Sequence, residues 1–198
     1  MGIFSPGFSG RSRERNPELP PGQYLETGFP VLTAGPTPRI DKRDWEFSVV
    51  SETGERRSWD WQAMLDLGAE DVATDIHCVT AWSKLGTHWR GVPIDRFLDA
   101  VDTNAEYLMA HSYGGYTTNM PLEEIKGRAW LAYEFEGEDL DPEHGGPARL
   151  LVPHLYLWKS AKWVNSLQLM AADAPGFWEQ NGYSMHGDPW LEERYWGS

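Results

Sequence analysis

The apolar segments of this chain are short, and strand patterns and helix patterns do not alternate regularly along it. A doubly wound parallel sheet requires a regular succession of strands and helices. Strand patterns also outnumber helix patterns here. The sequence therefore predicts an α+β domain with mixed β-sheets and short helices.

Six segments have the composition and periodicity expected of strands. They are residues 45–50, 72–79, 105–110, 128–135, 149–152 and 163–170. Three short helices are expected. They are one capped by Asp60 and ended by Gly68, one that begins at Pro93, and one over residues 121–126.

The length of 198 residues is that of a single domain, and folding at this size buries roughly 70% of the surface of the unfolded chain. Residues 1–22 are rich in glycine and proline and are expected to form a flexible N-terminal arm. We expect residues 23–198 to form the folded domain.

The formal net charge of −13 argues against nonspecific binding to nucleic acid and against docking on anionic membranes. No apolar run approaches the roughly 20 residues that span a bilayer, and no signal-peptide core follows the first arginines. We expect a soluble, cytoplasmic protein without membrane insertion. The sequence does not indicate its oligomeric state.

Six acidic residues lie close together, and they have two interpretations: a solvated loop or edge, or a docking face for a basic redox partner. They are Glu134, Glu136, Glu138, Asp139, Asp141 and Glu143.

Cys78 is the only cysteine, which excludes an internal disulfide and a cluster that needs several thiolates. It is expected where a strand ends and a loop containing Thr80, Gly86 and Gly91 begins. Three interpretations are open: a buried inert thiol, a nucleophile with a histidine base, or a single soft ligand of a metal held mainly by a cofactor. A zinc site is disfavoured because no second thiolate or standard spacing is present.

A second patterned block runs from His144 through two glycines and a proline to Arg149. The glycines would let the backbone approach a ligand closely, and the arginine offers a planar fork that suits phosphate. Residues 158–163 then provide Lys159, Ser160 and Lys162 between two tryptophans. The alternative is a hairpin that carries ordinary surface lysines.

Four blocks occur in a fixed order: Cys-Val-x-Ala-Trp-Ser from Cys78, Trp-x-Gly from Trp89, His-Gly-Gly-Pro-x-Arg from His144, and Pro-x-x-Tyr-x-x-Lys-x-x-Lys-Trp from Pro153. This order resembles the molybdenum-cofactor domain of the sulfite oxidase family. The resemblance covers about residues 29–183. It is closest to short bacterial sulfite oxidase-like oxidoreductases and to the catalytic subunit of the periplasmic methionine sulfoxide reductase.

The resemblance implies a molybdenum-molybdopterin cofactor whose metal is ligated by the Cys78 thiolate. It implies a catalytic tyrosine near the metal, for which Tyr183 is the best positional candidate. The alternative for Tyr183 is a packing residue in an aromatic tail with Trp178 and Trp190. His186 and Trp178 are further candidates for the same mouth. Cofactor contacts are implied for a larger set. The set is Pro30, Val31, Ser112, His144, Arg149, Ser160, Ala161 and Lys162.

The chain departs from the sulfite oxidases at residues 29–34, which read Phe-Pro-Val-Leu-Thr-Ala and lack the arginine that those enzymes use for sulfite. This difference argues against sulfite as the substrate. No haem-binding segment is present in the sequence, so we expect the electrons to pass to or from a separate protein.

The leading hypothesis is a molybdenum oxidoreductase that exchanges an oxygen atom with a small substrate, of the sulfoxide, N-oxide or oxyanion type. The first alternative is a molybdopterin-binding protein of the same fold without turnover. The second is a Cys-His hydrolase or transferase, for which the sequence positions neither a base nor an oxyanion hole.

Overall fold

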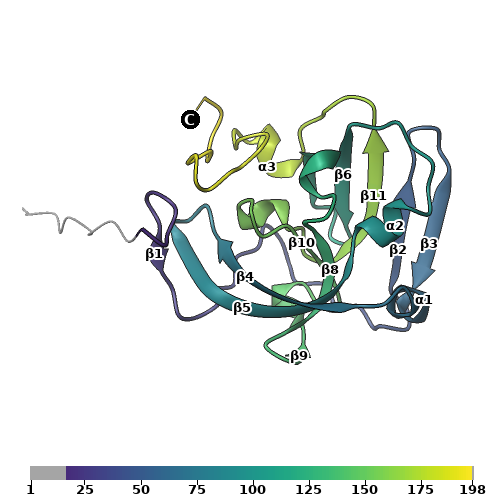
Figure 1. Cartoon of the computed structure of the whole chain (residues 1–198), viewed down its shortest axis with the longest axis horizontal. Coiled ribbons are helices and arrows are strands. Elements are labelled where there is room, and N and C mark those ends of the chain that lie inside the picture. The colour runs from purple at the N-terminus through teal and green to yellow at the C-terminus, as the bar shows by residue number, and fades with distance from the viewer. Residues whose placement is uncertain (1–16, 198) are drawn as a thin grey trace, which may run out of the picture.

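The computed structural model describes residues 17–197, so most of the predicted N-terminal arm lies outside the described residues. Within the part of the arm that is described, the side chain of Leu19 is buried against the domain. The described chain folds around two β-sheets connected by short helices (Figure 1).

The first sheet has six strands, of which β5 is long and curved (Figure 1). The strands are β1 (Tyr24–Leu25), β4 (Glu70–His77), β5 (Trp82–Pro93), β8 (Trp130–Phe135), β9 (Glu138–Asp139) and β10 (Arg149–Leu151). Their order is β1-β5-β8-β10, with β4 paired to β5 and β9 to β8. Only β1 pairs in parallel within this sheet, and it places Tyr24 opposite Trp82.

The second sheet has five strands in the order β3-β2-β11-β6-β7. They are β2 (Glu46–Val50), β3 (Arg56–Asp60), β6 (Tyr107–Ser112), β7 (Thr117–Pro121) and β11 (Val164–Met170). Strands β2 and β11 are parallel neighbours, whereas the other pairs are antiparallel. Both sheets are therefore mixed, and the predicted α+β class is confirmed.

Helices are few and short among the described residues. They are α1 (Trp61–Asp66), α2 (Asp95–Leu98), α3 (Phe177–Gln180) and three 3-10 turns, η1 (Leu122–Glu124), η2 (Pro142–His144) and η3 (Leu157–Lys159). Asp60 caps α1 as predicted, since its Oδ1 accepts a hydrogen bond of 2.8 Å from the Ala63 N–H. None of the helices in residues 17–197 is long and apolar enough to cross a membrane.

Two expectations around the cysteine were wrong. The segment after Cys78 is predicted as a loop. In the structure it is a short turn followed by the twelve-residue strand β5. A side chain at Gly91 would approach the Leu131 carbonyl oxygen at 2.8 Å, so this glycine allows β8 to lie against β5. Pro93 ends β5 and does not begin a helix; α2 starts two residues later.

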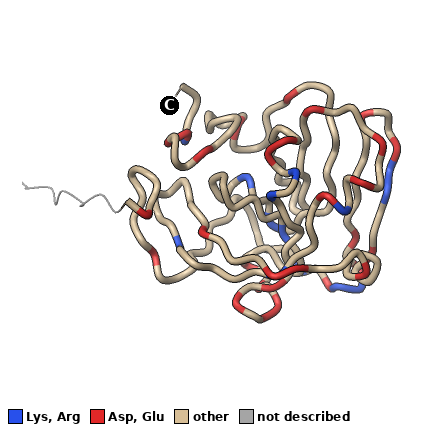
Figure 2. Tube along the Cα trace, in the orientation of Figure 1, with Lys and Arg blue, Asp and Glu red and all other residues tan. Residues whose placement is uncertain are grey.

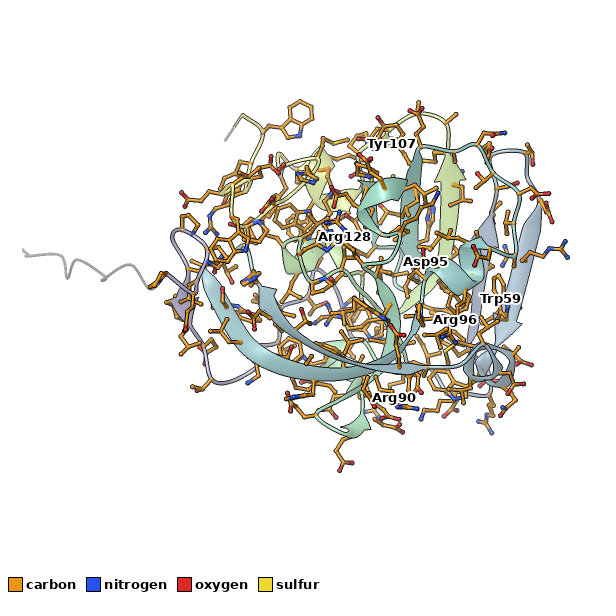
Figure 3. The ribbon with its side chains drawn as sticks, viewed as in Figure 1. Trp59, Arg90, Asp95, Arg96, Tyr107 and Arg128 are labelled. Carbon is orange, nitrogen blue, oxygen red and sulfur yellow. The ribbon has the colours of Figure 1, made fainter. Side chains whose placement is uncertain are left out.

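The main core consists of buried side chains from the five-stranded sheet, from α1 and α2, and from β8 and β10. Trp59 of β3 packs edge-on against Phe97 of α2, with ring centroids 5.0 Å apart, on the side of the molecule where Asp95 and Arg96 lie (Figure 3). A second cluster surrounds Cys78 and includes Trp82 and Trp89 of β5. Cys78 thus lies at the end of a strand of the six-stranded sheet, in the smaller core.

The acidic cluster predicted over residues 134–143 lies at the end of β8, in β9 and in the turn that follows (Figure 2). Glu138 and Asp139 are exposed, and the Asp139 carboxylate forms an ion pair of 2.6 Å with Lys42. This position agrees with the solvated-edge interpretation. The second interpretation, a docking face, stays a prediction.

Candidate functional site

A cavity of about 490 Å³ opens beside Cys78. Six segments far apart in the sequence surround it: residues 29–36, the turn after β4, the β6–β7 loop, the start of β10, η3 with the residues that follow it, and the C-terminal segment after β11. In Figure 1 the C-terminal segment lies above β1 and the beginning of β5. Eight residues proposed from the sequence line this cavity. They are Pro30, Cys78, Arg149, Ser160, Ala161, Lys162, Trp178 and Tyr183.

Cys78 begins a tight turn that connects β4 to β5, here called the cysteine turn (Cys78–Ala81). The Cys78 N–H donates to the Trp82 carbonyl at 2.8 Å, and the Ala81 N–H donates to the Cys78 carbonyl at 3.0 Å. Ala81 has a φ of 73°, a left-handed conformation that costs free energy for alanine. The strand pairing on both sides holds the turn and fixes where the sulfur lies.

The Cys78 side chain is buried, with 6% of its surface exposed. Its Sγ lies 3.1 Å from the Thr80 hydroxyl. Burial raises the pKa of the Cys78 thiol, while the hydrogen bonds from Thr80 and the charges of Arg194 and Lys162 act in the opposite direction. A bound cation would reverse this balance, because metal ligation removes the thiol proton.

Cys78 has no neighbouring ligands of its own kind: within residues 17–197, no group of three or more histidine, cysteine or acidic side chains could hold a metal ion. A metal at this cysteine must therefore take its remaining ligands from another molecule. This finding excludes a zinc site built from the described residues and agrees with the single-ligand interpretation.

Two cations lie at the cavity wall and bond to carbonyl oxygens. The Arg149 guanidinium, 2% exposed, donates to the carbonyls of His144 and Ser160, at 2.8 Å each. The Lys162 ammonium donates to the carbonyls of Leu32 at 2.9 Å and Glu143 at 2.6 Å. Neither cation forms an ion pair with a carboxylate of the described chain, and the nearby acidic residue Glu143 acts on Lys162 only from a greater distance.

Burial, and after it the charge of the neighbouring cations, shifts the pKa values at this wall. Burial and the Arg149 charge lower the pKa of Lys162 to about 8. Burial, followed by the charges of Arg149 and Lys162, lowers the pKa of His144 to about 4, so this imidazole is neutral at pH 7. A bound anion would relieve the repulsion between the two cations.

The two glycines before Arg149 serve the protein's own packing. Gly145 has a φ of 111°, and a Cβ there would lie 3.1 Å from the Lys162 Cα. A Cβ on Gly146 would lie 2.0 Å from the Leu140 carbonyl oxygen. The expectation that these glycines let the backbone approach a ligand was wrong, because the space is occupied by neighbouring backbone.

The alternative of a hairpin with surface lysines was also wrong. Residues 157–159 form η3, and the side chains of Lys159 and Ser160 are buried. The Ser160 hydroxyl accepts a hydrogen bond of 2.9 Å from the Val152 N–H and retains its own proton for donation. Lys159 does not line the cavity, and its ammonium lies 2.7 Å from the Glu179 carboxylate.

The far side of the cavity is formed by the C-terminal wall, defined as Phe177, Trp178 and Tyr183. The Tyr183 ring lies 5.0 Å from the Trp178 ring and 5.2 Å from the Trp158 ring, centroid to centroid. Burial, with smaller contributions from Tyr195 and Cys78, raises the pKa of Tyr183, so its phenol stays protonated at neutral pH. Tyr183 can therefore act as a hydrogen-bond donor in the cavity.

Three proposed cofactor residues lie outside the cavity lining. Val31 is exposed, although its neighbours Pro30 and Leu32 line the cavity. Ser112 lies at a different, open pocket on the five-stranded sheet, beside His111 and Gln168. His144 is set back from the cavity, and its ring stacks on Phe29 with centroids 3.9 Å apart.

His186, a further candidate for the mouth of the site, does not line the cavity and instead contacts two carboxylates. Its Nδ1 lies 2.6 Å from Glu193, and its Nε2 lies 3.1 Å from Glu124. Burial alone would lower its pKa, but these two carboxylates outweigh burial and raise the pKa of His186. Trp178, the other candidate, does line the cavity.

Sequence reasoning missed the β6–β7 loop, where Gly114, Gly115 and Tyr116 line the cavity. A Cβ built on either glycine would meet nothing within 4 Å, so the backbone there faces open space. The paired glycines were the signal in the sequence. Tyr116 is fixed by a hydrogen bond of 2.6 Å from its hydroxyl to the Trp158 carbonyl.

The residues present suit a polar, anionic occupant. Trp82 lines the cavity with its side chain 3% exposed, and its buried Nε1–H has no hydrogen-bond partner among the described residues. A buried donor without a partner is costly unless a bound group accepts from it. Together with the two cations, this donor fits a ligand that carries both phosphate and acceptor atoms.

Comparison with known proteins gives concordant matches. The profile of the oxidoreductase molybdopterin binding domain matches residues 34–178. An uncharacterized oxidoreductase, YuiH of Bacillus subtilis (strain 168), is 39% identical over 189 residues, which cover 93% of this chain and 96% of the relative. A putative protein-methionine-sulfoxide reductase subunit, YedZ1 of Azospira oryzae, is 26% identical over 75% of this chain and 57% of the relative.

Sulfite oxidase of Arabidopsis thaliana is 42% identical over a shorter stretch, 36% of this chain and 19% of the plant protein. Among solved structures, the sulfane dehydrogenase SoxCD of Paracoccus pantotrophus superposes with a TM-score of 0.64 at 18% sequence identity, over 74% of this chain and 42% of that one. This superposition confirms the sulfite oxidase-type fold. With the profile match and the Bacillus relative, it shows that the chain belongs to the family of oxidoreductase molybdopterin binding domains, whose cofactor is molybdenum-molybdopterin.

Proposed function

We propose that this protein is a molybdenum-dependent oxidoreductase that exchanges an oxygen atom with a small substrate of the sulfoxide, N-oxide or oxyanion type. The observation that carries the proposal is that one cavity brings together Cys78, the unpaired Trp82 donor, and the cations Arg149 and Lys162. One thiolate, one indole donor and two cations match a cofactor that supplies most of the metal's ligands and carries a phosphate.

In this proposal each group has a separate task. Cys78 would supply the protein's sulfur ligand, and Arg149 and Lys162 would bind the phosphate. Ser160, whose hydroxyl proton is free to donate, would complete the phosphate site together with the backbone at Ala161. When bound, the cofactor supplies the two-electron redox chemistry. The protein fixes its orientation and excludes water through the aromatic side chains around it.

Tyr183 is proposed to donate a hydrogen bond to the oxygen atom that is exchanged. It lines the same cavity as Cys78, and its raised pKa keeps the donor proton in place at neutral pH. A donor aimed at an oxygen that gains negative charge stabilises the transition state.

Neutral substrates are favoured within the proposed range. Residues 29–36 line much of the cavity without providing an arginine, and the C-terminal wall adds aromatic surface. Sulfite is a dianion and requires cations that this side of the cavity does not offer. The relative YedZ1, named as a putative protein-methionine-sulfoxide reductase subunit, supports a sulfoxide over sulfite.

A separate redox protein is proposed to exchange electrons with the site. The relative YedZ1 is named as a subunit, which supports a partner on another chain. The chain also spans only 57% of that relative. We therefore base the proposed substrate and partner on the residues of this chain itself. The open cavity supports the substrate, and the acidic surface beside β9 supports the redox partner.

The proposal is tested by expressing the protein in cells supplied with molybdate and measuring molybdenum and the fluorescent oxidation product of the pterin. Wild-type protein is expected to contain both at close to one equivalent. Cys78→Ser is expected to stay folded and lose molybdenum. Wild-type protein that lacks both would overturn the proposal.

Turnover is measured with a dye as electron donor and sulfoxides, N-oxides and chlorate as acceptors. Reduction of a sulfoxide or N-oxide by the wild-type protein supports the proposed reaction. Loaded protein without turnover in either direction would instead support a cofactor-binding protein. Equal molybdenum in wild type and Cys78→Ser would show that Cys78 does not anchor the metal.

A further inference from the structure

The hydroxyl of Thr80 lies against the sulfur of Cys78. The Oγ1 to Sγ distance is 3.1 Å, well inside the range for a hydrogen bond to sulfur. Both residues line the cavity. The hydroxyl therefore contacts the sulfur on a side that a bound group also reaches.

The backbone makes this contact a fixed property of the cysteine turn. Thr80 follows Cys78 by two residues, and the bonds from Cys78 N–H to Trp82 and from Ala81 N–H to Cys78 close the turn around it. From outside the turn, the Gln23 amide donates to the Cys78 carbonyl at 3.1 Å, and Arg194 donates to the Val79 carbonyl at 2.6 Å. Because the turn is held from both ends of the described chain, the hydroxyl and the sulfur stay together.

The direction of the hydrogen bond depends on the state of the sulfur. In the free protein either atom could donate. A metal-ligating thiolate has no proton, so Thr80 must then be the donor. Donation to a ligating sulfur withdraws electron density from it and stabilises the more electron-rich, reduced state of the metal.

We propose that Thr80 is a positioning residue that tunes the metal through Cys78: its hydroxyl donates a hydrogen bond to the ligating sulfur and raises the reduction potential of the metal. This inference rests on the proposed function, because it requires a metal at Cys78. Thr80 itself touches the sulfur and not the metal, so its effect is expected in the metal's electronic properties more than in cofactor content.

The test uses three loaded proteins: wild type, Thr80→Val and Thr80→Ser. Valine has nearly the shape of threonine and lacks the hydroxyl, whereas serine retains it. Three properties are measured: molybdenum content, the midpoint potential in a redox titration, and the energy of the sulfur-to-metal charge-transfer absorption. Thr80→Val is expected to keep its molybdenum, to have a lower midpoint potential, and to show the absorption at longer wavelength. Thr80→Ser is expected to have the midpoint potential and the absorption of the wild type.

A purely structural role for Thr80 predicts a different result. Unchanged potential and unchanged absorption in loaded Thr80→Val overturn the inference, even if the variant is less stable. So does a Thr80→Ser protein that behaves like the valine variant. Wild-type protein without molybdenum overturns the proposed function and this role with it, so the two failures are distinguishable.

If the valine variant does not fold or does not bind the cofactor, a measurement on the wild-type protein alone still tests the proposal. The metal–sulfur stretching frequency is recorded in H₂O and in D₂O, which replaces the hydroxyl proton. A frequency shift on exchange is expected for a hydrogen-bonded sulfur. No shift overturns the proposal without recourse to a variant.

Discussion

The ammonium of Lys159 lies 2.7 Å from the Glu179 carboxylate, and both side chains are completely shielded from solvent. The ammonium also donates to the carbonyls of Asn119 at 2.8 Å and Met185 at 2.7 Å. The same carboxylate oxygen accepts from the Trp158 indole at 2.9 Å. This pair connects the body of the domain to α3, which carries Phe177 and Trp178 of the C-terminal wall.

Lys159→Met is expected to destabilise the protein by about 3–5 kcal/mol, because it leaves Glu179 buried without its cation. The free energy of unfolding is measured by chemical denaturation. The matched control is Lys42→Met, which removes an exposed pair with Asp139 and is expected to cost about 1 kcal/mol or less. Equal losses in the two variants would contradict the role assigned to the buried pair.

Tyr183→Phe is expected to lower kcat about 100-fold while the molybdenum content stays at the wild-type level, because it removes one donor to the reacting oxygen. Steady-state kinetics and elemental analysis check the two halves of this expectation. Tyr195→Phe is the control: Tyr195 packs against Tyr183 at 5.4 Å but is exposed and does not line the cavity. A Tyr183→Phe enzyme with wild-type kcat would remove this residue from the reaction.

Lys162→Met is expected to reduce the pterin content tenfold or more when cofactor is limiting, because a charge-assisted hydrogen bond to phosphate contributes about 1.5–3 kcal/mol. Pterin is quantified by fluorescence after oxidation. Lys84→Met is the control, since its ammonium also donates to a carbonyl, that of Thr27 at 2.6 Å, but does not line the cavity. Full pterin occupancy in Lys162→Met would place the phosphate elsewhere.

His186 is expected to make stability depend on pH. Its pKa is raised in the folded protein, so the stabilisation is fully present below the unfolded value near 6.5 and is lost as the pH rises through the folded value. Unfolding free energies of wild type and His186→Asn are compared between pH 5.5 and 8.5. Their difference is expected to be largest at the acidic end of this range.

The comparison with the variant is needed because other histidines act in the opposite direction. His144 and His154 have lowered pKa values, so protonation of the unfolded chain reduces stability as the pH falls. Subtracting the unfolding free energy of the variant from that of the wild type at each pH removes most of the contribution of His144 and His154. A difference that is constant across the range would contradict the ion pairs assigned to His186.

Local sequence signals predicted the local structure well. The alternation over residues 45–50 corresponds to β2, and the carboxylate of Asp60 caps α1, because these features depend on neighbouring residues. Strand β5 was missed because Gly86 and Gly91 are usual signs of a loop. Gly91 is required instead by contact with β8, which lies forty residues further along the chain.

The candidate site was predictable where the sequence contains compact blocks. Cys78, Arg149 and Lys162 were proposed from such blocks, and the structure places all three at one cavity. The glycines beside Arg149 were misinterpreted, since glycine permits close packing against the protein as readily as against a ligand. The bond from Lys159 to Glu179 had no signal in the sequence, because it joins the 3-10 turn η3 to α3, and the two elements share no periodicity.

The hydrogen bonds from Gln23 and Arg194 to the cysteine turn also set an order of events during synthesis. The Arg194 guanidinium reaches the Val79 carbonyl across 115 residues of sequence. Until residue 194 has left the ribosome, the turn around the sulfur lacks one of its supports. A nascent chain paused before that point would present an incomplete binding site, so cofactor insertion is expected to follow translation.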